Sequence, residues 1–260
     1  MPNLQKLIAP LFIRRLVQSD KGRAYILNQA ADAESSDEGK IFDEILAVVD
    51  DPKVHKLVKI HQEDEERHAE LFLAAAKKIG VPLQEVPANL KLLARLDIAL
   101  GGFFQQFSEG KRGLMDIYLL LQVIEERATT QFRQLEPEMR KVDPAAADML
   151  LGIAEDEVRH LKYCRAISKQ YAPNPEVLQA TLAEFREVEG RVFGEHSRIN
   201  LEHCLDEKFM DLSAAETFFW RAILRTSKRK KLSAPSDFSP VEPSFLQVHL
   251  AKARAFASAN

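Results

Sequence analysis

The sequence predicts an all-α fold: a four-helix bundle with one long crossover, followed by additional helices. Apolar residues recur at intervals of three and four, strand-like alternation is absent, and the 260 residues include only ten glycines. Prolines and capping residues divide this helical pattern into separate helices. With 46% hydrophobic and 29% charged residues, the composition is typical of a soluble globular protein.

The first half of the predicted bundle is a hairpin of two long helices. A short leading helix falls within residues 1–19, and the first long helix covers about 20–49. Asp51 and Pro52 supply an N-cap and a first-turn proline for the second long helix, which extends to about Ile79. The link between the two helices is short, so we expect them to be antiparallel.

The second half is a matching hairpin. After a loop over 80–87, a connecting helix is predicted for about 89–107, and the third long helix follows it. Asp143 and Pro144 then start the fourth long helix, which ends near Tyr171. The crossover of about 30 residues lets the second hairpin pack beside the first.

The chain beyond the second hairpin adds further helices. Pro173 and Pro175 separate them from the bundle, and helical periodicity resumes over about 176–205 and 214–224. The predicted division is an N-terminal helix (1–19), a bundle (20–171), extra helices that pack on it (172–226) and a polar tail with a short helix (227–260).

Charge and cysteine content exclude several classes of protein. The formal net charge of -3 provides no global basic field that would attract nucleic acid or anionic lipid. Two cysteines cannot build a disulfide framework, which favours a reduced, cytoplasmic environment. The N-terminus lacks the pattern of a secretory signal, and no apolar run approaches the length of a membrane span. We interpret the basic cluster from Lys228 to Lys231 as a solvated helix end in preference to an RNA contact.

The second and fourth long helices carry the same motif, D-E-x-R-H. Residues 64–68 read D-E-E-R-H, and residues 156–160 read D-E-V-R-H. In both helices the motif glutamate lies 13 residues after the first-turn proline. A repeat that preserves both the helix start and the motif is hard to ascribe to chance.

The first and third long helices each supply a carboxylate at the same level. Glu34 lies 31 residues before Glu65, and Glu125 lies 32 residues before Glu157. The Asp-Pro turn is near the middle of each interval, so folding each hairpin brings its two carboxylates level. Within each motif, Glu and His are three residues apart and therefore share one face, which is otherwise apolar.

Four carboxylates and two imidazoles in an apolar interior predict a centre of two metal ions. Buried carboxylates without compensation would be prohibitively costly, and two divalent cations would remove that cost. Oxygen and imidazole ligands of this number suit a di-iron or di-manganese pair. The predicted ligands are Glu34, Glu65, His68, Glu125, Glu157 and His160.

Four alternatives stay open at this point. Glu126 competes with Glu125, although the face of Glu125 is the more apolar, and Glu38 competes with Glu34. A metal-free bundle would instead neutralise the glutamates with the arginines of the two motifs. His61 lies one turn before Glu65, and we interpret it as a buried polar group that supports the ligands. A role for His61 as an additional ligand remains the alternative.

These features resemble the ferritin-like di-iron carboxylate superfamily over residues 20–171. The doubled D-E-x-R-H motif is similar to that of bacterial multicomponent monooxygenases, and V-I-E-E-R at 123–127 resembles tRNA-isopentenyladenosine hydroxylases. The resemblance implies a ferritin-like bundle in which Asp64 and Asp156 orient ligating imidazoles. It also implies that Thr129, four residues after the third-helix glutamate, assists proton delivery near bound O2.

The function implied is that of a non-haem di-iron oxygenase or oxidase, which activates O2 to oxidise or hydroxylate an apolar organic substrate. Two iron ions are expected, with a manganese–iron pair as the variant. No flavin, nicotinamide or haem motif is present, so the electrons must come from an external donor. Alternatives are iron oxidation and storage, rubrerythrin-like peroxide reduction, and a metal-free helical scaffold. A homodimer is also left open.

Overall fold

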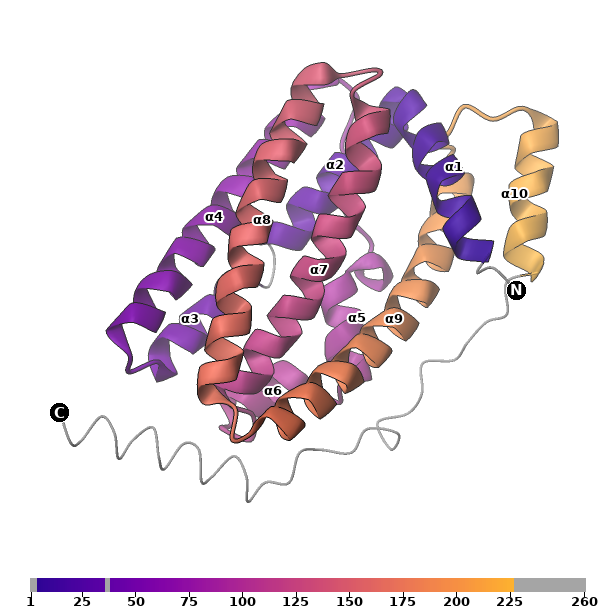
Figure 1. Cartoon of the computed structure of the whole chain (residues 1–260). Helices are drawn as coiled ribbons and strands as arrows, with labels where there is room; N and C mark the ends of the chain where they lie inside the picture. The colour runs from indigo at the N-terminus through magenta and orange to yellow at the C-terminus, as the bar shows by residue number, and fades with distance from the viewer. Residues whose placement is uncertain (1–3, 36–37, 227–260) are drawn as a thin grey trace.

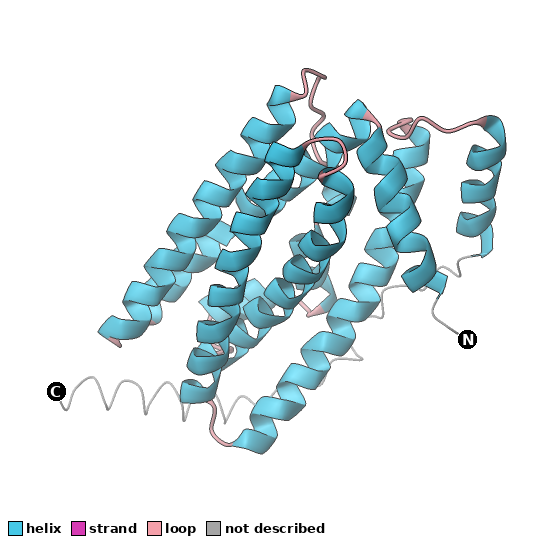
Figure 2. Cartoon of the chain, turned by 45° about the horizontal axis from the view of Figure 1, so that its top comes forward, coloured by secondary structure: helices cyan, strands magenta, loops and turns pink. Residues whose placement is uncertain are grey.

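The chain folds as an assembly of helices. The structure is a computed structural model that describes residues 4–35 and 38–226, and the regular structure of these residues is entirely helical (Figures 1 and 2). The predicted all-α class is therefore confirmed. Within the same residues, no helix combines the length and the apolar character needed to cross a membrane. The basic cluster Lys228 to Lys231 and the short helix expected in the tail lie outside the described residues.

Two helical hairpins lie side by side (Figure 1). In the first, α2 and α3 pack along α4. In the second, α7 packs along α8, and α4 contacts α8 across the two hairpins. The bounds are α2 (Asp20–Ser35), α3 (Glu38–Val48), α4 (Pro52–Lys78), α7 (Leu114–Met139) and α8 (Pro144–Tyr171).

The two motif-bearing helices start as the sequence predicts. Asp51 accepts a hydrogen bond at Oδ1 from the backbone N–H of Lys53 at 2.8 Å, and Pro52 occupies the first turn of α4. Asp143 accepts one at Oδ1 from the backbone N–H of Ala146 at 3.0 Å at the start of α8. Equivalent caps give the two helices the same register between proline and motif.

The first long helix, expected over about 20–49, is described in two parts, α2 and α3, on either side of residues 36 and 37, which lie outside the described residues. The prediction of a single connecting helix over about 89–107 was wrong. The crossover contains the short helices η1 (Ala88–Leu90), α5 (Leu92–Ala99) and α6 (Phe103–Ser108). Gly101 and Gly102 have φ of 70° and 80°, left-handed values that end α5 before α6 begins.

The remaining helices pack on one side of the hairpins. The long helix α9 (Pro175–Asp206) contacts α7 and α5, and α10 (Ala214–Thr226) contacts α9. The leading helix α1 (Leu4–Gln18) packs on α2 and α7 and lies beside α10 (Figure 1). Trp220 of α10 is buried there, with its ring centroid 6.2 Å from that of Phe12.

Two apolar layers enclose the level of the predicted ligands. On α4, Val58 belongs to one layer and Phe72 to the other, and the motif lies between them. On α8 the order is reversed, with Ile153 before the motif and Cys164 after it, because α8 runs antiparallel to α4. The motif side chains therefore form a polar layer between two apolar ones.

Candidate metal centre

Five of the six predicted ligands are buried in this polar layer. Glu65 and His68 come from α4, Glu125 from α7, and Glu157 and His160 from α8. Glu34 comes from the end of α2 and is only partly buried. The structure thus brings together side chains from four helices that are up to 126 residues apart in sequence.

The two motif histidines point Nδ1 at the glutamates of both motifs. Nδ1 of His68 lies 3.4 Å from Oε1 of Glu157 and 3.7 Å from Oε2 of Glu65. Nδ1 of His160 lies 3.1 Å from Oε1 of Glu65 and 3.4 Å from Oε2 of Glu157. Each imidazole therefore faces its own helix's glutamate and that of the opposite helix.

The other nitrogen of each imidazole is held by the aspartate of the opposite motif. Nε2 of His68 lies 3.2 Å from Oδ2 of Asp156, and Nε2 of His160 lies 3.1 Å from Oδ2 of Asp64. We call these two contacts the crossed pairs. An acceptor at Nε2 keeps a proton on that nitrogen, so Nδ1, which faces the carboxylates, is the nitrogen that can bind a metal ion after it loses its own proton.

The motif arginines neutralise the aspartates of the crossed pairs. Arg67 lies 2.6 Å from Asp64 and 2.7 Å from Asp156. Arg159 lies 2.6 Å from each of the same two carboxylates. Burial opposes ionisation of Asp156, but these arginines and His68 hold its pKa well below its usual value. The arginines therefore do not serve the glutamates in the way that the metal-free alternative requires.

The structure places Glu125, and not Glu126, in the polar layer. Glu126 faces away from it and accepts hydrogen bonds from Arg186 at 2.7 Å and from Arg165 at 3.3 Å. The apolar face assigned to Glu125 is thus the inward face of α7. The side chain of Glu38 lies outside the described residues.

His61 also enters the cluster, more closely than its predicted supporting role requires. Its Nε2 lies 2.9 Å from Oε1 of Glu125 and 3.0 Å from Oε1 of Glu65. Its ring centroid is 4.0 Å from that of His160 and 4.5 Å from that of Phe42. The side chain is fully buried. The sequence signal for this position was the spacing of four residues to Glu65, which places both side chains on one helix face.

The donor atoms form two groups that share Glu65. One group, here the His61 group, contains His61, Glu65, Glu125 and His160. The other, here the Glu34 group, contains Glu34, Glu65, His68 and Glu157. In each group, one ligand atom per residue lies within 4.8 Å of all the others. Each group of buried or partly buried side chains could hold a metal ion.

The protonation of the cluster reflects crowded carboxylates. Burial and the charge of Glu157 hold the pKa of Glu125 well above its usual value. Burial opposes protonation of the motif histidines, yet Glu157 and Glu65 raise the pKa of His68 to about 9 and that of His160 to about 10. Burial lowers the pKa of His61, with His160 contributing. Without bound cations, the carboxylates therefore retain protons on the neighbouring imidazoles.

Several of these atoms are close together but are not aligned for hydrogen bonds. Among the described residues, Nδ1 of His68, Nδ1 of His160 and both carboxylate oxygens of Glu157 are buried without a hydrogen-bond partner. Buried polar atoms without a partner are costly, and each such atom calls for an explanation. Lone pairs that converge on a cation would satisfy them. Mixed carboxylate and imidazole donors suit divalent iron and manganese.

Thr129 lies one turn after Glu125 on the inward side of α7. It is buried, and among the described residues its Oγ1 has no hydrogen-bond partner. The hydroxyls of Tyr118 and Tyr163 are also buried without one, and the Tyr163 ring centroid lies 5.3 Å from that of His61. The layer next to the cluster therefore contains hydroxyl groups that can donate protons.

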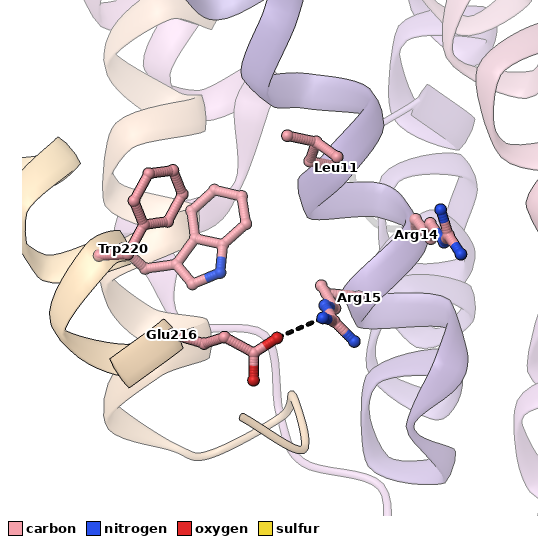
Figure 3. Close-up of a pocket in the computed structure, with 6 residues that line it drawn as sticks. Leu11, Arg14, Arg15, Glu216 and Trp220 are labelled. Carbon is pink, nitrogen blue, oxygen red and sulfur yellow. Dashed lines mark hydrogen bonds and ion pairs between the residues drawn. The ribbon is translucent and has the colours of Figure 1, made fainter. Parts of the chain in front are cut away.

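A separate cavity of about 280 Å³ lies between α1 and α10 (Figure 3). Its lining residues are Leu11, Arg14, Arg15, Glu216, Phe219 and Trp220. An ion pair joins Arg15 to Glu216 beside it. Neither helix contributes a donor atom to the two groups, so this cavity is not part of the metal cluster.

No protein-family model, curated protein or solved structure matches this chain. The assignment of the site therefore depends on its own residues and their geometry.

Proposed function

We propose that the chain is a ferritin-like di-metal oxidoreductase, which uses two iron ions or a manganese–iron pair to activate O2 and oxidise an organic substrate. One observation carries this proposal: two groups of four donor residues share Glu65 inside a layer closed by apolar side chains. The pairing of α2 and α3 with α4, and of α7 with α8, with a long crossover between, supports the ferritin-like arrangement.

The six predicted ligands are distributed between the two groups, and each group would hold one ion. Glu65 belongs to both groups and would help to hold both ions, while Glu125 would add negative charge in the His61 group and Glu157 in the Glu34 group. His68 and His160 would each supply a nitrogen, held in orientation by the crossed pairs. A pair of such ions, when bound, supplies the electrons that reduce O2 and the oxidising power that acts on the substrate.

The surrounding residues would control water and protons. The apolar layers around the cluster exclude water, which strengthens the electrostatic interactions within it. The buried hydroxyl of Thr129 has no hydrogen-bond partner among the described residues, so it would be available to pass a proton toward the ions. The return of electrons to the ions would require an external donor.

The test is to load the metal-free protein with ferrous iron without oxygen, and then to add O2 together with a chemical reductant. We expect about two iron ions per chain. We also expect O2 uptake that continues while reductant lasts, as an oxidase or oxygenase requires. Native mass spectrometry of the freshly purified protein would identify an organic molecule that co-purifies. A protein that takes up neither iron nor manganese would contradict the proposal.

Iron oxidation for storage or detoxification is the second candidate. The observation that favours it is the partial exposure of Glu34, which gives ions a carboxylate near the surface. In this case O2 uptake measured without reductant would stop once the added ferrous iron is oxidised, and further ferrous iron would restart it. An oxygenase that holds two oxidised ions would not respond to further ferrous iron, so O2 uptake without reductant separates the two candidates.

A further inference from the structure

His61 differs from the other polar side chains that surround the cluster. Asp64 and Asp156 contact the outer nitrogens of the motif histidines, whereas Nε2 of His61 points inward, at the same oxygen of Glu65 that Nδ1 of His160 approaches. Four donor residues thus converge around one position. Their separations are 2.9 Å for His61 to Glu125, 3.0 Å for His61 to Glu65 and 3.1 Å for His160 to Glu65.

These separations suit a shared cation. Donor atoms that bind one ion at right angles, each about 2.1 Å from it, lie roughly 3 Å apart. The ring of His61 is fixed between Phe42 and His160, so its nitrogen has little freedom to turn elsewhere. We propose that His61 is a metal ligand, and that it makes the two ions of the centre chemically unequal. This inference rests on the proposed di-metal function.

The inequality follows from the composition of the groups. With His61 bound, the His61 group offers two imidazoles and two carboxylates, while the Glu34 group offers one imidazole and three carboxylates. Imidazole suits iron well, and carboxylates suit manganese. The His61 group is therefore the position that selects iron, and the Glu34 group is the position that also accepts manganese.

His61 binds its ion less firmly than His160 does. Among the described residues, Nδ1 of His61 has no hydrogen-bond partner, whereas Asp64 holds the outer nitrogen of His160. Imidazole ligands gain affinity from such an acceptor. Loss of His61 should therefore weaken the binding of one ion and leave the binding of the other unchanged.

The experiment compares the wild-type chain with His61→Ala and His61→Gln. Gln can donate a hydrogen bond to Glu65 and Glu125, but it offers no imidazole lone pair. In anaerobic titrations with ferrous iron, we expect both variants to bind one ion as the wild type does. The second ion should bind at least about tenfold more weakly. His196→Ala removes a buried histidine of α9 and serves as the matched control, with two ions bound at wild-type affinity.

Mössbauer spectra of the iron-loaded wild type keep the test independent of how the variants fold. We expect two ferrous signals of equal area and different parameters, and a crystal structure should place Nε2 of His61 about 2.1 Å from one ion. Wild-type affinities in His61→Gln together with identical environments for the two irons would overturn the role of His61 while leaving the di-metal proposal intact. A wild-type chain that binds no metal would overturn the di-metal proposal itself.

Discussion

The helices α4 and α8 carry the same motif in the same register but differ one turn before it. Both start with an Asp cap and a first-turn proline, and both present a glutamate and a histidine to the polar layer. At the position one turn before the motif glutamate, α4 has His61 and α8 has Ile153. His61 contacts two glutamates, whereas Ile153 belongs to an apolar layer.

The difference shows which part of the site is symmetric and which is not. The motif alone builds two equivalent halves, because each half contributes one aspartate, one glutamate, one arginine and one histidine to a shared network. A single substitution outside the motif is enough to make the halves unequal. In the proposed di-metal function, the symmetric part would decide whether metal binds, and the unequal part would decide which ion binds in which group.

The largest expected effect comes from removing the glutamates of both motifs. Glu65→Ala combined with Glu157→Ala removes ligands of both groups, so metal content should fall at least about a hundredfold at equal free metal. Helical circular dichroism should persist, because the change also removes two crowded, buried carboxylates. Metal analysis after dialysis measures the result.

The control for this variant is Glu66→Ala combined with Glu155→Ala. Glu66 is the variable residue inside the first motif and Glu155 directly precedes the second motif, but both are exposed. They should leave metal content unchanged. Equal metal content in the two double variants would show that the ions bind elsewhere.

The next largest effect is that of pH on metal affinity. The pKa values of about 9 for His68 and about 10 for His160 mean that both imidazoles are protonated in the metal-free protein at neutral pH. Each must lose its proton to bind an ion, so affinity should rise by about tenfold per pH unit for each displaced proton. The rise should continue up to about pH 9. Calorimetry in buffers of different ionisation enthalpy would count the released protons, and an affinity that is the same at pH 6 and pH 8 would contradict this assignment.

The same pKa values predict how the metal-free protein responds to base. A folded-state pKa above the unfolded value of 6.5 contributes stability that is complete below that value and is lost as the pH rises through about 9 to 10. The melting temperature of the metal-free protein should therefore fall between pH 7 and pH 10. The melting temperature of the metal-loaded protein should fall less over this range, because its imidazoles no longer carry those protons.

A smaller effect is expected when one crossed pair is weakened at a time. Asp64→Asn removes the charged acceptor of His160 and should lower the affinity of the His61 group for its ion. Asp156→Asn removes the acceptor of His68 and should lower the affinity of the Glu34 group for its ion. Each change should cost about 10–100-fold in affinity for one ion. Each variant is the control for the other, since both aspartates contact both arginines. Identical effects on both ions would show that the aspartates act only on the packing of the helices.

The smallest effect on metal binding is expected at Thr129. Thr129→Val keeps the shape of the side chain and removes the hydroxyl, so both ions should still bind. The rate of O2 consumption should fall by about 10-fold or more if the hydroxyl delivers a proton during turnover. Stopped-flow measurements on the loaded protein would follow the reaction, and unchanged kinetics would remove Thr129 from it.

Much of the fold could be predicted because local signals were strong. The Asp-Pro starts of α4 and α8, and their ends near Ile79 and Tyr171, follow from capping and periodicity. The prediction of a single connecting helix over about 89–107 was wrong. Apolar residues keep their helical spacing across Gly101 and Gly102, but the left-handed backbone of these two glycines ends the helix. Apolar spacing alone does not show the backbone conformation of a glycine.

The side chains that the structure brings together could be predicted from the sequence, whereas their pairings could not. The apolar face of the third long helix favoured Glu125, and the structure places this side chain in the cluster. Sequence proximity cannot reveal that Asp64 contacts His160 instead of the histidine of its own motif, because that contact depends on how α4 and α8 meet. The inward direction of His61 is likewise set by packing against Phe42 and His160.

The crossed pairs have a consequence for how such a centre can be built. Neither hairpin orients its own histidine, since His68 depends on Asp156 and His160 depends on Asp64. Two identical hairpins related by a two-fold axis would make the same reciprocal contacts, as isologous interfaces do. A single hairpin with this motif would therefore complete the crossed pairs only as a dimer, whereas two hairpins joined in one chain can differ, as His61 of α4 and Ile153 of α8 do.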